Sequence, residues 1–119
     1  MTVVNLANVD EITPSNNLLA LDGTGDVTLI DVAADYCAKV NSIIVANVHA
    51  STAATITIQV SIDNGSNYVH IVNAVDIPNN SSLNVLAAPI YLDETDLMQV
   101  QASAADILTV FVSYELMSD

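Results

Sequence analysis

The amino-acid sequence predicts an all-β fold, an antiparallel β-sandwich that is either Ig-like or jelly-roll-like, with an extended N-terminal arm. The clearest observation is the run 39–62, in which two strand patterns flank the small residues 50–54. In the second pattern apolar and polar residues alternate, which is typical of a strand with one buried face. The apolar set is Ile56, Ile58, Val60 and Ile62, and the polar set is Thr55, Thr57, Gln59 and Ser61.

Composition and turn signals support the same fold class. The chain has 119 residues, of which 52% are hydrophobic, so it is long enough for one folded domain with a real core. With four Tyr, one Phe and no Trp, that core must be aliphatic and thin, which suits two packed sheets. We expect residues 1–17 to form the arm and residues 18–119 to form the sandwich.

Charge excludes several classes of partner. The chain contains 14 acidic residues and a single basic residue, Lys39, which gives a formal net charge of −13. DNA, RNA and anionic membranes would be repelled, so we expect neither a nucleic-acid partner nor a membrane partner. The acidic surface serves solubility, docking on a basic protein surface, or cation binding.

The first half of the chain contains irregular and strand-like segments. Residues 1–17 are weakly patterned and are predicted to be an arm or an irregular first strand. A short strand at 18–21, a glycine-containing turn at 22–26 and a strand at 27–32 follow, and a helical turn would fit only at 33–38. The strand 43–48 is apolar on both faces and therefore needs cover on both sides.

The second half begins with the strongest hairpin signal, Asn64-Gly65 between two strand patterns. We expect a strand within 67–77, a break at 78–81, and short strands at 82–87 and 90–92. The acidic turn 93–96 precedes two strands, 97–103 and 107–116, which are predicted to close the chain as a hairpin. The last strand is also apolar on both sides.

Catalytic residue patterns are missing from the sequence. The only histidines, His49 and His70, lie in strand patterns, and the chain has no Gly-x-Ser-x-Gly motif for a nucleophilic serine. Cys37 is the only cysteine, so it cannot form an intramolecular disulfide, and we interpret it as a small buried apolar residue. We expect the protein not to be an enzyme.

Ligand sites are weakly indicated. Two acidic loops, Asp93/Glu94/Asp96 and Asp22/Asp26, offer oxygen ligands for calcium, but neither matches an EF-hand loop. We expect no cofactor or metal, with calcium at these loops as the alternative. Sugar binding would need exposed aromatic rings, for which the candidates are Tyr68, Tyr91 and Tyr114.

From Val40 onward the chain resembles small structural proteins of tailed bacteriophages. The resemblance covers about residues 40–116 and follows the runs VNSIIVANVHASTAATITIQV, NYVHIV, IPNNSSLNVLAAPIYLDETDLMQVQAS and ILTVFVSYEL. It implies a β-sandwich of the virion head, neck or tail and carries over no functional residues. The sequence departs from the family pattern at Glu94-Thr95-Asp96, where relatives often have a Gly-Asp turn.

The two strands that are apolar on both faces predict a subunit-contact surface. We expect Ile43, Val45, Ile107 and Phe111 to form it, covered by a neighbouring subunit or by the arm. The protein is then a homo-oligomer that docks on the major capsid protein, as a head decoration or cement protein. The alternatives are a neck or tail accessory protein and a carbohydrate-binding module. Without a signal sequence or a membrane span, we expect assembly in the host cytoplasm and localisation in the virion.

Overall fold

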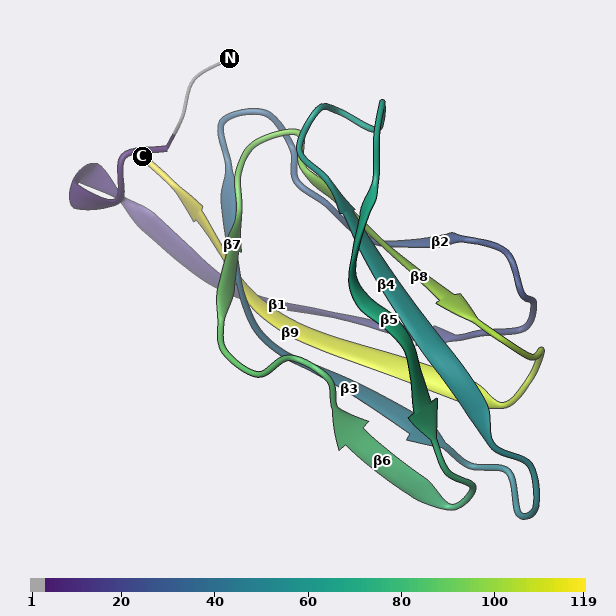
Figure 1. Cartoon of the computed structure of the whole chain (residues 1–119). Coiled ribbons are helices and arrows are strands. Elements are labelled where there is room, and N and C mark those ends of the chain that lie inside the picture. The colour runs from purple at the N-terminus through teal and green to yellow at the C-terminus, as the bar shows by residue number, and fades with distance from the viewer. Residues whose placement is uncertain (1–3) are drawn as a thin grey trace.

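The chain folds into two stacked antiparallel sheets (Figure 1), in a computed structural model that describes residues 4–119. Sheet A contains β1 (Glu11–Ala20), β9 (Leu108–Ser118), β3 (Cys37–Asn47), β6 (Ser81–Asn84) and β7 (Ile90–Leu92). Sheet B contains β2 (Val27–Asp31), β8 (Leu97–Ala102), β4 (Ala54–Ser61) and β5 (Val69–Ile77). A single 3-10 turn, η1 (Leu6–Asn8), precedes β1. Within residues 4–119 no helix is long and apolar enough to cross a membrane.

The strand pairing identifies the sandwich as a jelly roll. Strands pair from the two ends of the chain inward: β1 with β9, β2 with β8, β3 with β6 and β7, and β4 with β5. This is one long antiparallel ribbon that turns between β4 and β5 and is rolled into two layers. The prediction of an all-β antiparallel sandwich is confirmed, and of the two predicted kinds the jelly roll is the one observed.

The core between the sheets is aliphatic, as the composition predicts. Ile43 and Val110 from sheet A and Ile56, Ile58 and Met98 from sheet B are all fully buried. Burial of about 25 cal/mol for each Å² of apolar surface stabilises this arrangement, and the β-branched side chains pack well on pleated strands.

The alternation predicted for β4 holds for the side chains that face the core and fails at the end of the strand, where Ser61, expected on the wet face, is fully buried. Ile56 and Ile58 face the core, and Val60 is half-buried. Ile62 was expected on the same face, but β4 ends at Ser61, and Ile62 is 79% exposed. The period of two applies only while the backbone remains extended and paired.

The N-terminal segment is more ordered than an arm of 17 residues. Residues 11–17 belong to β1, which pairs with β9 along its whole length, so the expected boundary at residue 17 falls inside a strand. The remaining described segment, residues 4–9, turns back onto the chain. Val4 and Val9 pack with Cys37 and Met117 in a small cluster. Residues 1–3 of the expected arm lie outside the described residues.

Two local predictions need correction. Strands β8 and β9 are consecutive but lie in different sheets, so they are not the hairpin expected at the C-terminus. Residues 33–36 form a turn instead of part of a helix, and Cys37 already begins β3. The first error arises because strand partners are chosen by long-range packing, which local sequence patterns do not report. The second arises because the pairing of Cys37 and Ala38 with β9 extends β3 into the segment 33–38.

The predicted Asn64-Gly65 turn is confirmed between β4 and β5. Asn64 has φ 58° and Gly65 has φ 87°, as a type I′ turn requires, and the N–H of Ser66 donates to the carbonyl of Asp63 at 3.3 Å. A Cβ at Gly65 would lie 3.3 Å from Cδ1 of Leu97, so both the backbone and the space favour glycine.

Candidate interaction surface

An apolar row crosses the outer face of sheet A, the face that points away from the core. Leu18 of β1 pairs in register with Phe111 of β9, which pairs in register with Ile44 of β3. Residues directly opposite each other on neighbouring strands share one face of the sheet, so the three side chains are adjacent. Leu18 is 62% exposed and Ile44 is 41% exposed, while Phe111 is half-buried.

The rows on either side are uncharged. One row is Asn16, Ser113 and Ser42, and the other is Ala20, Thr109 and Ala46. We call these nine residues of three rows the sheet A patch. None of the nine residues is charged, although the chain contains 14 acidic residues. Charge returns in the next row, where Lys39 pairs in register with Glu115.

Three of the four predicted contact residues are not on this surface. Ile43 and Val45 are fully buried in the core, and Ile107 is 7% exposed just before β9. They therefore cannot form a contact surface of the folded chain. Phe111 alone lies on the outer face, because β9 alternates and its neighbours Val110 and Val112 point inward.

The prediction failed because β3 is apolar on both faces. In the run Ile43-Ile44-Val45 the sequence shows two faces but does not say which one the second sheet covers. Sequence reasoning also missed Leu18, because it assigned the neighbouring residues to an arm. The run 16–21, with the sequence NNLLAL, has no period-two alternation, so no pattern identified Leu18 as the leucine that faces outward.

Residues 4–9 cover one end of the same outer face. Ala38 lies in the main core, so its neighbour Cys37 points to the opposite side of sheet A, where it meets Val4 and Met117. The chain thus shields the end of this face with its own N-terminal segment. The sheet A patch, several residues further along β3 and β9, has no such cover from residues 4–119.

A second exposed apolar region lies along β5, at the edge of sheet B. Val69 is 69% exposed and Ile71 is 45% exposed, and β5 pairs only with β4. The pairing is interrupted by two register shifts, and Ala74 has φ 50°. Bulges of this kind twist an edge and oppose the addition of another strand. This edge is less suited to association than the flat face of sheet A.

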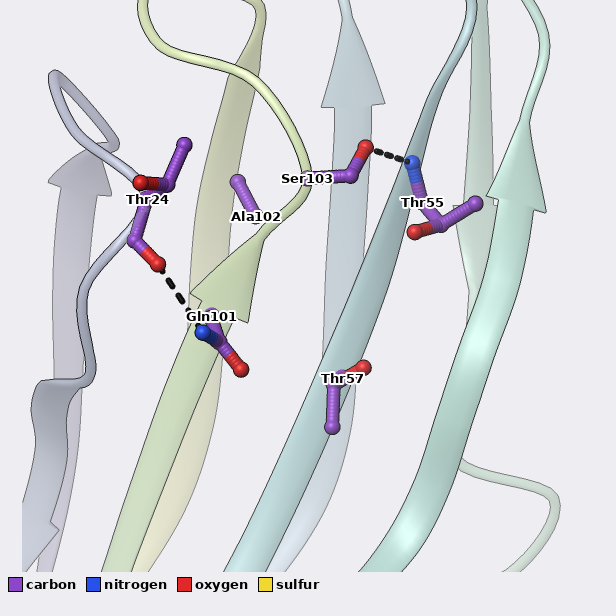
Figure 2. Close-up of a pocket in the computed structure, with 6 residues that line it drawn as sticks. All are labelled: Thr24, Thr55, Thr57, Gln101, Ala102 and Ser103. Atoms are coloured by element: carbon purple, nitrogen blue, oxygen red, sulfur yellow. Dashed lines mark hydrogen bonds between the residues drawn. The ribbon is translucent and has the colours of Figure 1, made fainter.

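The outer face of sheet B carries a shallow polar hollow of about 340 Å³ (Figure 2), lined by Thr24, Thr55, Thr57, Gln101, Ala102 and Ser103. Several of its polar groups have partners within the chain. The Nε2 of Gln101 donates to the carbonyl of Thr24 at 2.9 Å, and the N–H of Thr55 donates to Oγ of Ser103 at 2.8 Å. The hollow therefore offers hydroxyl and amide groups that are largely committed to the fold.

The tyrosines proposed for sugar binding do not line this hollow. Tyr114 packs against the main core, and Tyr91 lies on β7 in sheet A, paired with Lys39. Tyr68 lies in the loop before β5, with its hydroxyl near Gly65. The three rings come from different parts of the fold and lack the shared aromatic platform that stacking on a sugar uses.

The acidic turn 93–96 is part of the folded structure rather than a solvated loop. Glu94 is buried, and its Oε2 accepts from the N–H of Asp35 at 2.8 Å, while its buried Oε1 has no hydrogen-bond partner. Asp96 is also buried, and its Oδ2 accepts from the N–H of Asp93 at 2.8 Å. Burial raises the pKa of Asp96, and the bond from Asp93 partly offsets this effect.

The side chains that could hold a metal or attack a substrate are dispersed. Within residues 4–119 no group of three His, Cys, Asp or Glu side chains is placed to hold a metal ion, and both Asp22 and Asp26 are exposed. The Nδ1 of His49 accepts from the N–H groups of Ser51 and Thr52 in a turn.

Cys37 is buried with Val4 and Met117 and is poorly suited to act as a nucleophile. Burial, followed by the nearby carboxylates of Asp93 and Asp96, raises the pKa of its thiol. The thiolate, which is the reactive form, is therefore disfavoured. This agrees with the interpretation of Cys37 as a small buried apolar residue.

Comparison with known proteins shows a similar fold and no family. No protein-family model and no curated protein matches the chain. A protein of the Bacillus endospore appendages, a family of disulfide-linked pili, has a TM-score of 0.50 and 11% identity over 99% of this chain and 91% of that chain.

Two further solved structures are more distant. A pentameric capsid protein isolated from metagenomic phage sequences has a TM-score of 0.38 and 16% identity, covering 96% of this chain and 62% of that chain. Eiger TNF from S. frugiperda has a TM-score of 0.38 and 11% identity, covering 98% and 89%. The likeness to the appendage protein shows the fold alone, and these two are too distant to carry an argument.

Proposed function

We propose that this protein is a non-enzymatic structural protein of a tailed-phage virion, and specifically a head decoration or cement protein. In this role it stabilises the capsid through contacts between subunits and with the major capsid protein. The observation that carries the proposal is the sheet A patch, an uncharged face with an exposed apolar row on a jelly roll of net charge −13. Exposed apolar patches mark sites of association.

Two further observations support a structural role. The sequence resembles small virion proteins over about residues 40–116, and jelly rolls recur among viral capsid proteins. In the described chain the histidines, the cysteine and the buried carboxylates each have a place in the fold and do not form a catalytic group. Because jelly rolls also occur in lectins, the fold by itself does not decide between these roles.

Two alternatives differ from this proposal in location and in ligand. A neck or tail accessory protein would use the same kind of contact in far fewer copies. A carbohydrate-binding module would use the polar hollow on sheet B, but several of its hydrogen-bonding groups are committed within the fold and no tyrosine lines it. The proposed location is the virion, after assembly in the host cytoplasm.

The test is the copy number of the protein in purified particles, measured by quantitative mass spectrometry against the major capsid protein. We expect about one copy for each capsid subunit, or one for every few. A handful of copies in each particle would contradict a decoration protein and support the neck or tail alternative. Absence from particles would overturn the virion proposal, and binding to a glycan array would then support the carbohydrate-binding alternative.

A further inference from the structure

We infer that the sheet A patch binds a second copy of this chain, face to face, in a weak symmetric contact. The inference rests on the proposed structural function and goes further, since it names the partner and the surface. In a two-fold contact the same patch serves both copies. The row Leu18, Phe111 and Ile44 would form the centre, and the flanking Asn, Ser, Thr and Ala residues would surround it.

Charge decides between a second copy and a different partner. Two copies with a net charge of −13 each repel one another at close range, and the Debye length of about 8 Å at physiological ionic strength does not remove repulsion between charges in contact. Identical copies can therefore approach most favourably through a surface without charge. A basic partner would instead bind where carboxylates are exposed. The nine residues of the sheet A patch include no carboxylate, and the nearest one at this end is the exposed Asp106, which lines a hollow with Ala20 and Thr109.

The small residues of the patch allow close contact between two sheets. Ala20, Ala46, Ser42 and Ser113 surround the larger side chains, so the apolar row projects beyond its neighbours. Stacked sheets pack about 10 Å apart when side chains of this size interdigitate. Phe111, the only phenylalanine of the chain, lies in the middle of the three strands.

The area of the patch predicts a weak contact. Three strands about 4.8 Å apart and five residues at about 3.4 Å each cover on the order of 250 Å². A stable complex buries about 800 Å² on each partner. The contact alone is thus too small for a permanent dimer. It becomes effective when copies are held near one another on a larger assembly, where the effective concentration reaches about the millimolar range.

The test is sedimentation velocity of the purified chain over a concentration series, at low and at high NaCl. We expect a monomer at low concentration and reversible association at high concentration. Association should become stronger as NaCl increases, because salt screens the repulsion between like-charged copies. An interface made of ion pairs would show the opposite dependence on salt.

A matched pair of variants locates the contact. Leu18→Glu places a charge in the patch, and Val69→Glu places the same charge on the opposite sheet. Both positions are exposed apolar residues on edge strands, at 62% and 69% exposure. We expect Leu18→Glu to weaken association at least tenfold and Val69→Glu to change it less than twofold, with circular dichroism confirming that both variants fold.

The outcomes separate this inference from the proposed function. A wild-type chain that remains monomeric at high concentration and high salt would overturn the inference, as would equal weakening by both variants. If the protein is then still abundant in particles, the proposed function survives without the contact. If it associates through the patch but is absent from particles, the contact survives and the virion role fails.

Discussion

At the scale of single residues, Asn47 is a buried polar side chain that joins three segments of the fold. It is buried, and its Nδ2 donates to the carbonyls of Thr52 and Ile77, both at 2.9 Å. Its Oδ1 accepts from the N–H of His49 at 2.9 Å. One side chain thus connects the end of β3 with the loop before β4 and the end of β5.

Replacing Asn47 with Ala should lower the free energy of unfolding by about 3 kcal/mol, because buried backbone groups lose their partners. The measurement is urea denaturation. Asn79→Ala is the control, since the Nδ2 of Asn79 donates to the carbonyl of Ala50 at 3.0 Å in an exposed position. Asn79→Ala should change the free energy of unfolding by less than about 0.5 kcal/mol. Equal losses in the two variants would contradict the role of Asn47.

Asp63 organises the turn between β4 and β5 through its ionised carboxylate. Asn67 donates to it from the side chain and from the backbone, both at 2.8 Å, and the hydroxyl of Ser61 donates at 2.8 Å. These bonds, the side-chain bond of Asn67 first, lower the pKa of Asp63 from 3.8 to about 2. A lowered pKa adds stability above about pH 3.8, and that stability is lost as the pH falls toward 2.

Asn67→Ala should therefore raise the pKa of Asp63 toward its ordinary value. The measurement is an NMR titration of the Asp63 carboxyl carbon in the wild type and the variant. His70→Ala, on the neighbouring strand, serves as a control that leaves the three bonds in place. A pKa that stays near 2 in Asn67→Ala would show that the Asn67 side chain is not its cause.

At the scale of elements, the acidic turn 93–96 joins β7 to β8. Its contribution to the free energy of unfolding depends on pH. The pKa of Asp96 is raised, so its contribution to stability is present below about pH 3.8 and is lost as the pH rises through the folded-state value. Asp96→Asn keeps an oxygen that can accept from the N–H of Asp93 and removes the charge. The variant should melt at a higher temperature than the wild type at pH 7.

The higher melting temperature of Asp96→Asn should disappear near pH 3, where Asp96 is protonated in both the folded and the unfolded state. Thermal unfolding at the two pH values measures it. Asp22→Asn, in an exposed loop, is the control for the general effect of removing one negative charge. A gain at pH 7 that is no larger than the gain from Asp22→Asn would contradict the local explanation.

The segment 4–9 acts as a cover for one end of sheet A. Val4 is buried against Cys37 and Met117, whereas Leu6 in the same segment is 50% exposed. Val4→Ser should loosen the cover and increase the rate at which Cys37 reacts with a thiol reagent such as DTNB. Leu6→Ser should leave the rate unchanged. If neither variant changes the rate, Cys37 is protected by other parts of the chain.

At the scale of the whole molecule, net charge opposes folding. The chain has fourteen acidic residues and only one basic residue, so its negative charges repel one another more strongly in the compact state than in the unfolded chain. Adding NaCl at pH 7 should therefore raise the melting temperature, and the effect should shrink near pH 4, where many carboxyl groups are protonated. Leu18→Glu at low protein concentration suits this measurement, since association would also raise the melting temperature. A melting temperature that falls with salt would contradict this balance.

Much of the local structure could be predicted from the sequence. The alternation around Ile56 and Ile58 identified β4 and its buried face, and Asn64-Gly65 identified the turn before β5. These features depend on the period of the strand and on backbone conformations available near glycine, both of which are local. The candidate site was predicted less well, since Phe111 was found but Leu18 and Ile44 were not.

The sequence by itself determined that this protein is an all-β domain with an aliphatic core, few residues suited to catalysis or metal binding, and a strongly acidic surface. Only the tertiary structure decided that the sandwich is a jelly roll, that β8 and β9 lie in different sheets, and that Ile44 rather than Ile43 points outward. The physical reason is that alternation defines two faces of a strand without ranking them. Which face is buried depends on partners far away in the chain, such as the pairing of Ile44 with Phe111.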